Sequence, residues 1–421
     1  MSASAVDEDR LWADHEALAR LTEPERPFTR RSFSPLFSEG RAWLERRFRD
    51  AGLETRIDAG GNLIGRLEGA DADAGTLMTG SHSDTVPRGG RFDGISGVLA
   101  GIEVARCLSA RGHRLRHGFE VVDFLAEEAS DCGVSCVGSR AMTGHLDETL
   151  LAQIFPDGRS LAQALEAVGG DPGGLAGAVR HDIRAFLELH IEQGPVLESA
   201  GTAIGVVAAI VGIARVEIVF EGKAGHAGTV PMGGRRDALA AAAALVGWVK
   251  RSATEIARAA PGHFVATAGV LEVEPNAPNV VPASARLVID ARSDDRGRVG
   301  RFVESLRAEA EAAAARQGVR LAVCGLLSES LPVTCDGRLQ RAIARAADGL
   351  GLSSMTMASG AGHDTSFLAR ICPAAMVFVP CRDGLSHHAD EWAEPAALAA
   401  GSSVLLATVE TLDDDGPETA A

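Results

Sequence analysis

The stretch FEVVDFLAEE, residues 119–128, decides the fold class of this chain of 421 residues. Residues 119–126 are apolar apart from Glu120 and Asp123, and such a run is typical of a strand buried on both faces of a parallel sheet. Glu127 and Glu128 follow at the carboxyl end of this run. Because parallel sheets bind ligands beyond the carboxyl ends of their strands, we expect the chemistry of the protein at this edge.

Other segments repeat this arrangement. Short apolar runs predict further strands, at 76–79, 185–189 and 376–379. An apolar stripe over 95–108, which ends at Gly112, predicts a helix. Strands that alternate with helices predict an α/β domain in which helices flank a mixed, mostly parallel sheet.

The segment 213–328 has a different order of elements. Its pattern reads strand, helix, strand, strand, helix, strand, which is the order of a ferredoxin-like α+β sandwich. Because the pattern of the first domain resumes after this segment, we interpret it as an inserted domain. The catalytic domain would then consist of residues 1–212 and 329–421.

Charge and composition argue against several classes of function. The chain has 57 acidic and 41 basic residues and a net charge of −16, so neither nucleic acid nor an anionic membrane is an expected partner. Apolar runs such as 206–213 are much shorter than the roughly 18 residues of a membrane span. The seven cysteines form no paired CxxC pattern, and the first residues lack an apolar signal core. We therefore expect a cytoplasmic protein.

Imidazole and carboxylate side chains follow the predicted strands, and they are the ligands that zinc, manganese and cobalt take in hydrolases. The candidates are His82, Asp93, Glu127, Glu128, His190 and His387. Two metal ions about 3.5–4 Å apart can share one water molecule. Each residue taken singly could be an ordinary loop residue, and adjacent glutamates often form a solvated patch. Their common position at one sheet edge favours a metal site, in which one glutamate binds metal while the other acts as a general base.

Asp84 follows His82 by two residues. A carboxylate there can hold the imidazole nitrogen that faces away from a metal. We therefore predict that Asp84 orients His82.

Motifs along most of the chain carry a resemblance. They are GSHSDTVPRGGRFDG (80–94), FLAEE (124–128), LELHIEQGPVLE (187–198), GKAGHAGTVPMGGRRDAL (222–239), NVVPASARLVIDAR (279–292), SGAGHD (359–364) and DGLSHHADEW (383–392). The chain resembles the binuclear-metal amidohydrolase family of N-carbamoyl-L-amino-acid hydrolases, β-ureidopropionases and allantoate amidohydrolases. That family is related to aminoacylases and metallo-aminopeptidases.

The resemblance implies a site with two divalent metal ions, expected to be zinc, with manganese, cobalt or nickel as alternatives. His82, Asp93 and His190 would hold one ion. Asp93 would bridge to the second ion, which Glu128 and His387 would also hold.

The resemblance also implies roles for residues around the metals. Glu127 would be the general base, Gln193 would contact the amide or ureido group, and His226 would stabilise the oxyanion. The substrate carboxylate would be bound by Asn279, by Arg292 and by the backbone at Gly360 and Gly362. Arginine suits this task because its planar guanidinium meets a carboxylate with two hydrogen bonds.

Members of the family dimerise through the inserted domain. The resemblance therefore implies a homodimer, in which the inserted domain also acts as a lid and His226 would serve either its own site or that of the partner. We expect the two domains to close around a small carboxylated substrate.

The predicted activity is metal-dependent hydrolysis of a linear amide C–N bond. The predicted substrate is an N-carbamoyl-L-amino acid or another ureido acid, which would yield amino acid, ammonia and CO₂, and allantoate is a close variant. An N-acyl amino acid amidase or small peptidase is one alternative, and a catalytically inactive binding protein is another. The family commonly has Glu-Glu-Gly followed by an Arg-Phe pair, whereas residues 127–133 here read EEASDCG, so the substrate stays open.

Overall fold

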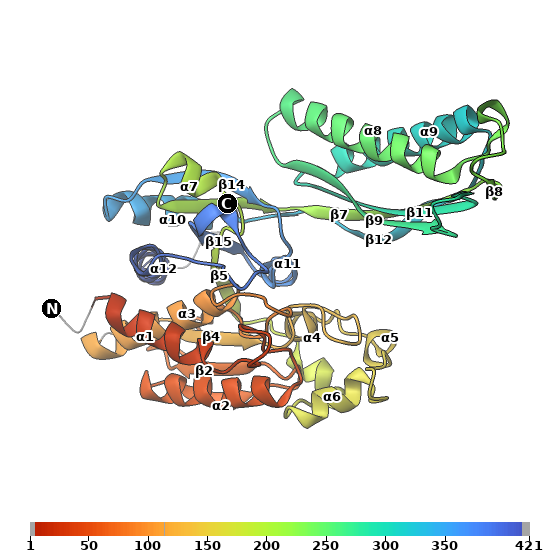
Figure 1. The fold of residues 1–421 in the computed structure, drawn as a ribbon. Coiled ribbons are helices and arrows are strands. Elements are labelled where there is room, and N and C mark those ends of the chain that lie inside the picture. The colour runs from red at the N-terminus through yellow and green to blue at the C-terminus, as the bar shows by residue number, and fades with distance from the viewer. Residues whose placement is uncertain (1–4, 113, 415–421) are drawn as a thin grey trace. The chain divides into compact units, whose positions relative to one another are not determined.

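A computed structural model describes residues 5–112 and 114–414. The chain forms two compact units (Figure 1). The first unit comprises Met1–Ala208, Cys335–Met357 and Ala361–Ala421, and the second comprises Ala209–Thr334 and Ala358–Gly360. The segment 213–328, which the sequence pattern marks as an insertion, lies within the second unit.

The sheet of the first unit has the strand order β1-β2-β4-β3-β5-β15-β6, and β14 also pairs with β6. These strands are β1 (Glu54–Ile57), β2 (Leu63–Leu67), β3 (Thr76–His82), β4 (Gly118–Phe124), β5 (Ile183–Ile191), β6 (Ile204–Ile210), β14 (Ser354–Ser359) and β15 (Ala374–Val379). The central strands β4, β3, β5 and β15 are parallel, whereas β1, β2 and β6 pair antiparallel with their neighbours. The predicted mixed, mostly parallel sheet is confirmed.

Helices flank this sheet. They are α1 (Glu8–Ala19), α2 (Pro35–Asp50), α3 (Ile95–Arg111), α4 (Val137–Met142), α5 (Glu148–Leu151), α6 (Leu161–Ala167), α7 (Val196–Ala200), α10 (Gly337–Gly349), α11 (Thr365–Leu368) and α12 (Pro395–Asp414). Helices α3 and α12 pack on the central strands. Helices α4 and α11 form an apolar cluster with strands β3, β4 and β5, which includes Met142, Phe186 and Phe367. Helix α3 ends where Gly112 takes a left-handed conformation with φ of 60°, as the sequence predicts.

Helix α12 is long and apolar enough, by length and composition alone, to cross a membrane. Its apolar side chains have a simpler explanation in the fold. The helix packs against α1, α3 and α10 and against strand β15, so that side chains such as Val404, Leu405 and Val409 are buried.

The second unit is an α+β sandwich. Its four-stranded sheet has the order β12-β7-β11-β9, and every neighbouring pair is antiparallel. The strands are β7 (Gly212–Glu221), β9 (Phe264–Glu274), β11 (Ser284–Ser293) and β12 (Arg320–Ser330), and the helices are α8 (Ala238–Ala259) and α9 (Arg296–Gln317). This arrangement confirms the ferredoxin-like order predicted from the sequence.

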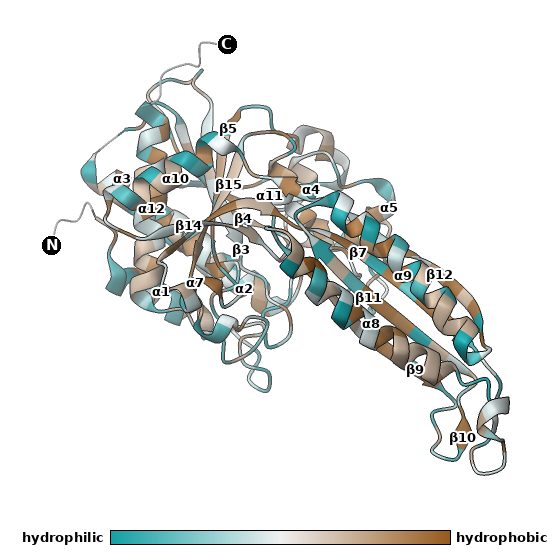
Figure 2. Cartoon of the chain, turned by 90° about the horizontal axis from the view of Figure 1, so that it is seen from above, coloured by the Kyte–Doolittle hydropathy of each residue, from teal (hydrophilic) through white to brown (hydrophobic). Residues whose placement is uncertain are grey.

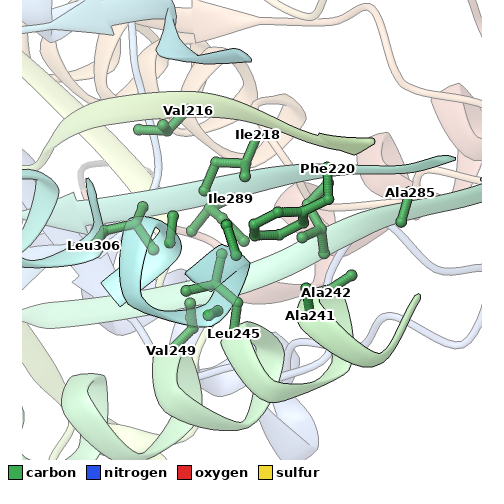
Figure 3. Packing of buried hydrophobic residues seen from close by; sticks show 14 of the residues in the cluster. Val216, Ile218, Phe220, Ala241, Ala242, Leu245, Val249, Ala285, Ile289 and Leu306 are labelled. Carbon is green, nitrogen blue, oxygen red and sulfur yellow. The ribbon is translucent and has the colours of Figure 1, made fainter. Parts of the chain in front are cut away.

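Alternation of side chains along the central strands places the core of the second unit on one face of its sheet. Phe220, Leu245, Ile289 and Leu306 meet there, between the sheet and the two helices (Figure 3). The intervening residues of β11 are polar or charged at several positions, so hydrophobic and hydrophilic residues follow one another along the strand (Figure 2). Asp237 and Asp295 cap α8 and α9 through their side chains.

Short pairings complete the second unit. Strands β8 (Gly225–His226) and β10 (Val280–Val281) form a small antiparallel ribbon. Strand β13 (Val333–Thr334) pairs with Ala209 and Ile210 at the end of β6.

Candidate metal centre

The carboxyl ends of the parallel strands bring the predicted ligands of the first unit together. Two groups have ligand atoms within 4.8 Å of one another: His82, Asp93 and His190 in one, and Asp93, Glu128 and His387 in the other. His82 ends β3, His190 lies near the end of β5, and the remaining three lie in the loops that follow strands or precede α3. The structure thus collects these five side chains, which are up to 305 positions apart in the chain, at one edge of the sheet.

Asp93 belongs to both groups and presents a different oxygen to each. Its Oδ1 lies 3.2 Å from Nε2 of His190 and 3.7 Å from Nε2 of His82. Its Oδ2 lies 3.1 Å from Nε2 of His387, whose Nε2 is also 3.1 Å from Oε1 of Glu128. This is the geometry expected of a carboxylate that bridges two cations.

The far nitrogens of the two buried histidines bind backbone carbonyls. Nδ1 of His82 lies 3.0 Å from the carbonyl oxygen of Asp84, and Nδ1 of His190 lies 2.8 Å from that of Ile191. A carbonyl can only accept, so both Nδ1 atoms carry a proton, and in the neutral imidazole each Nε2 keeps a lone pair for a ligand. At present Nε2 of His190 accepts the backbone N–H of Gly94 at 3.0 Å.

Gly94 is required by the packing between these imidazoles. Its φ is 68°, in the left-handed region, and a Cβ atom there would lie only 2.3 Å from Nε2 of His82. The glycine lets the chain turn from the Asp93 loop into α3 without displacing His82.

Asp84 acts through two different atoms. Its carbonyl oxygen, rather than its carboxylate, makes the short contact with His82, because Oδ1 is 3.6 Å from the same nitrogen. Oδ1 instead accepts the backbone N–H of Glu127 at 3.3 Å. Asp84 therefore lies between the candidate ligand and the candidate base.

Glu127 and Glu128 separate at the end of β4, as expected for adjacent residues. Ala126, just before them, has a φ of 51°, and the following loop is closed by the backbone N–H of Cys136, which donates to the carbonyl of Glu127 at 2.9 Å. Oε2 of Glu127 lies 3.7 Å from Nε2 of His82, while Glu128 faces His387. Strained backbone of this kind is often found where a side chain must point into a site.

The surroundings shift the pKa values of the carboxyl groups in opposite directions. Burial, with the nearby carboxylate of Glu128, raises the pKa of Glu127 well above its ordinary value. Burial would also raise the pKa of Asp93, but the imidazoles of His190 and His387 beside its carboxylate hold that pKa well below its ordinary value. Hydrogen bonds to Asp93 and Glu128 raise the pKa of His387 to about 11. Such a divergence suits one carboxyl that exchanges protons and another that stays ionised.

Gln193 lies against the centre with a left-handed φ of 57°. Its side-chain amide donates to Oδ2 of Asp93 at 2.8 Å and to the hydroxyl of Ser386 at 3.2 Å. Its Oε1 is buried and has no hydrogen-bond partner among the residues that the structure describes. A ureido or amide N–H would satisfy this acceptor.

The remaining predicted residues lie in the second unit, except Gly362. His226 and Asn279 come together at the β8–β10 ribbon, where the N–H of Ala227 donates to the carbonyl of Asn279 at 2.9 Å. Arg292 lies near the opposite end of β11, with Nη1 donating to the carbonyl of Gly360 at 3.0 Å. Gly362 is exposed in the first unit. The roles assigned to these residues stay predictions.

Sequence reasoning missed two buried glutamates. Glu391 accepts the backbone N–H groups of Phe92 and Asp93, and Glu188 accepts hydroxyls from Ser81 and Thr365. A charge inside the apolar strand that precedes His190 was a usable signal for Glu188, because a buried charge needs partners. Glu391 gave no such signal, since it follows Asp390 in a loop that reads as solvated.

Glu188, His190 and His363 form a third group whose possible ligand atoms lie within 4.8 Å of one another. Both oxygens of Glu188 already accept hydrogen bonds, at 2.7 Å from Ser81 and 2.6 Å from Thr365. The two groups that share Asp93 are therefore the better candidates. Three imidazole nitrogens and two carboxylates, with Nδ1 of His82 and His190 turned to backbone carbonyls, fit a divalent metal ion.

Three comparisons place this geometry among known proteins. Residues 78–411 match the family model described as peptidase family M20/M25/M40. The chain is similar to an N-carbamoyl-L-amino acid amidohydrolase of Geobacillus stearothermophilus, at 38% identity over 96% of this chain and 98% of that protein. It is 36% identical to a ureidoglycolate hydrolase of Oryza sativa subsp. japonica, over 97% of this chain and 85% of that protein.

Two further similarities agree with these. An allantoate amidohydrolase of Bacillus subtilis (strain 168) is 36% identical over 84% of this chain and 85% of that protein. A crystal structure of an amidase of the hydantoinase/carbamoylase family from Burkholderia multivorans superposes with a TM-score of 0.90. That structure is 36% identical and covers 98% of this chain and 99% of its own.

Proposed function

The chain belongs to peptidase family M20/M25/M40, and from this premise we propose that it hydrolyses the linear amide C–N bond of a ureido acid. The family resemblance read from the motifs is thereby confirmed. Relatives similar over most of their length are named as amidohydrolases of N-carbamoyl-L-amino acids and of allantoate and as a ureidoglycolate hydrolase. We therefore place N-carbamoyl-L-amino acids first among substrates and allantoate and ureidoglycolate next.

The observation that carries the proposal is the shared carboxylate of Asp93. Its two oxygens face two separate groups of ligand atoms, and Glu127 lies beside one of them. Two divalent ions, with zinc as the first expectation, would be held there, one by His82, Asp93 and His190 and the other by Asp93, Glu128 and His387. When bound, they would polarise the carbonyl under attack and lower the pKa of a water molecule.

The residues of the chain supply the remaining chemistry. Glu127 takes a proton from the attacking water and delivers it to the leaving nitrogen, a task that its raised pKa favours. Gln193 positions the ureido group through its unsatisfied Oε1. The carbamate released by cleavage breaks down to ammonia and CO₂, which leaves the free amino acid.

Arg292 is the proposed anchor for the substrate carboxylate. Its Nε donates to Oδ1 of Asp290 at 2.7 Å and its Nη1 to the carbonyl of Gly360 at 3.0 Å. Asp290 also binds Nε of Arg215 at 3.0 Å. A substrate carboxylate would add to this network with charge-assisted hydrogen bonds.

The second unit itself supports a homodimer. Its strand β11 runs from Ser284, next to the ribbon with His226 and Asn279, to Arg292, which is about 26 Å away at the usual rise of a strand. A small ureido acid cannot contact both ends. If Arg292 and His226 both bind substrate, they serve different active sites, so His226 would complete the site of a partner chain.

Turnover by the metal-loaded chain tests the proposed activity. The purified protein is stripped of metal, reloaded with Zn²⁺, Mn²⁺ or Co²⁺, and assayed for ammonia release. The substrates are N-carbamoyl-L-amino acids, β-ureidopropionate, allantoate and ureidoglycolate, and amine release is followed from N-acetyl and N-formyl amino acids. Metal-dependent ammonia from a ureido acid supports the proposal. Amine release from acyl substrates alone would instead indicate an N-acyl amino acid amidase. No product from any of these substrates would contradict the proposed activity.

Mixing two impaired variants tests the dimer. His226→Ala and Arg292→Ala would each weaken both sites of a homodimer. A mixed dimer would keep one intact site, which takes Arg292 from one chain and His226 from the other. After unfolding and refolding together, an equal mixture should recover about a quarter of the parent activity. No recovery, with exchange of chains verified, would place both residues in the same site.

A further inference from the structure

Glu391 has no part in the reaction proposed above, yet its carboxylate is fully buried beside the candidate metal centre. Its Oε1 accepts the backbone N–H groups of Phe92 and Asp93, at 2.8 and 3.2 Å. Its Oε2 accepts the hydroxyl of Ser386 at 2.8 Å. One side chain therefore joins the segment that carries Asp93 to the segment that carries His387, from a position 299 residues after Phe92.

The chain makes room for this carboxylate at Gly90. A Cβ atom at that position would lie 2.3 Å from Oε1 of Glu391 and 2.4 Å from its carboxyl carbon. Gly90 also has a φ of 102°, which side-chain-bearing residues rarely adopt. Two separate features of the backbone thus accommodate Glu391 where it lies.

The hydroxyl of Ser386 links this carboxylate to Asp93. The hydroxyl oxygen lies 2.8 Å from Oε2 of Glu391 and 3.2 Å from Oδ2 of Asp93. Because a hydroxyl has one proton, the shorter contact directs that proton to Glu391, and the amide of Gln193 donates to the serine oxygen at 3.2 Å. Oδ2 of Asp93 is therefore left to the amide of Gln193, at 2.8 Å, and to His387, at 3.1 Å.

Asp93 needs such support because it must serve two groups at once. The terminal torsion of an aspartate is broad, so a carboxylate without fixed neighbours samples many orientations. Asp93 can present Oδ1 to His190 and Oδ2 to His387 only if its backbone and its carboxylate are both held. Glu391 holds the backbone at Asp93 directly. It also holds the hydroxyl of Ser386, which lies beside the carboxylate of Asp93.

We propose that Glu391 is a positioning residue of the metal centre, which fixes Asp93 relative to His387 through two backbone N–H groups and Ser386. This inference rests on the metal-dependent function proposed above. It assigns Glu391 no contact with substrate. Its effect should appear first in metal affinity, because side chains that orient metal ligands typically change affinity about 10- to 100-fold.

The decisive variant is Glu391→Gln. Glutamine keeps one carbonyl oxygen for the two backbone N–H groups, but its NH₂ group cannot accept the hydroxyl proton of Ser386. We expect the Zn²⁺ affinity of the stripped full-length chain to fall about 10- to 100-fold, measured by competition with a chromophoric chelator. Ser386→Ala removes only the linking hydroxyl and should cause a smaller loss in the same measurement.

Asp413 provides a matched control. Its carboxylate is also buried and also accepts two consecutive backbone N–H groups, those of Arg116 and His117, at 2.8 and 2.9 Å, together with the side chain of His117. Asp413→Asn should lower thermal stability about as much as Glu391→Gln but leave Zn²⁺ affinity at the parent value. Excess Zn²⁺ should restore kcat in Glu391→Gln, which a purely structural defect would not allow.

The outcomes separate this inference from the proposed function. Parent-like Zn²⁺ affinity in Glu391→Gln, or an equal loss in Asp413→Asn, would overturn the role of Glu391 while leaving a working metallohydrolase. A parent chain that binds no metal and cleaves no ureido acid would overturn the proposed function itself. Should Glu391→Gln fail to fold, Ser386→Ala decides, and unchanged affinity in that variant overturns the inference.

Discussion

In the first unit the side chains of His82, Asp93 and His190 are almost fully buried, whereas in the second unit His226 and Asn279 are exposed and Arg292 is half-buried. The buried side chains contact one another and backbone groups, so their positions are fixed before any ligand arrives. The exposed side chains lie on a ribbon and on the open face of a sheet. The first unit holds an assembled centre, while the second presents parts that a substrate or a partner chain must complete.

The difference follows from what each kind of group costs to bury. A carboxylate or imidazolium inside a protein must be paired, so the first unit surrounds its charges with hydrogen-bond donors and acceptors. A group at the surface keeps its water until a ligand displaces it. We therefore expect substitutions in the first unit to damage chemistry or folding, and those in the second to damage substrate binding.

The largest effect should come from Glu127→Gln. Glutamine has nearly the same shape but cannot take a proton, so kcat should fall about 10²- to 10⁴-fold. Bound metal, measured by elemental analysis, should stay at the parent level because the ligands are untouched. Turnover close to that of the parent would remove Glu127 as the base.

Breaking buried and exposed ion pairs compares the two units directly. Asp123 accepts a hydrogen bond from Nε of Arg41 at 2.9 Å, and both side chains are buried in the first unit. Asp123→Ala leaves the guanidinium without its carboxylate and should lower the free energy of unfolding by about 3–5 kcal/mol.

The counterpart in the second unit is the more exposed pair of Glu217 and Arg286, whose side chains are 24% and 35% exposed and lie 2.6 Å apart. Glu217→Ala should lower the free energy of unfolding by less than about 1 kcal/mol, because water replaces the lost partner. Urea unfolding followed by circular dichroism measures both variants. Equal losses would contradict the contrast between the units.

Arg292→Ala should produce a smaller, selective effect. Losing a charge-assisted contact worth about 1.5–3 kcal/mol predicts a roughly 10- to 150-fold loss in kcat/KM for substrates with a free carboxylate. Arg215 is the matched control, since it binds the same Asp290, and Arg215→Ala should change kcat/KM far less. If amidated and free-acid substrates suffer alike in Arg292→Ala, this residue is not the anchor.

A small effect on stability alone should come from a helix cap in the second unit. The side chain of Asp237 accepts the backbone N–H of Ala240 at 3.1 Å at the start of α8. Asp237→Ala should lower stability by about 1 kcal/mol without changing metal affinity. Thermal unfolding measures the loss, and Ser34→Ala, which removes the equivalent cap of α2 in the first unit, should cost a similar amount.

Much of the fold could be predicted because its signals are local. The apolar run before Glu127 predicts a buried strand, and Gly112 predicts the end of α3, since each depends on residues within one element. The metal ligands could be proposed because several strands end in residues of the same chemistry. Parallel strands then bring these ends to one edge without further information.

Other features could not be read from the chain. His82 was expected to bind the carboxylate of Asp84, but its nearer contact is the carbonyl oxygen of that residue. The two-residue spacing of His82 and Asp84 favours neither the carbonyl oxygen nor the carboxylate as the partner. The turn after β3 decides which of the two faces the imidazole. Glu391 gave no signal for the same reason, since the backbone groups that it binds, at Phe92 and Asp93, lie about 300 positions earlier in the sequence.

The sequence by itself determined the order of the elements, the two kinds of sheet and the residue types at the strand ends, because backbone preference and apolar periodicity act over a few residues. Only the tertiary structure decided which oxygen of Asp93 faces which histidine, and that Glu391 fixes that loop. It also placed His226 on the ribbon next to the start of β11, and Arg292 near the end of that strand. Those arrangements depend on packing between segments far apart in the chain, where a shift of about 1 Å makes or breaks a hydrogen bond.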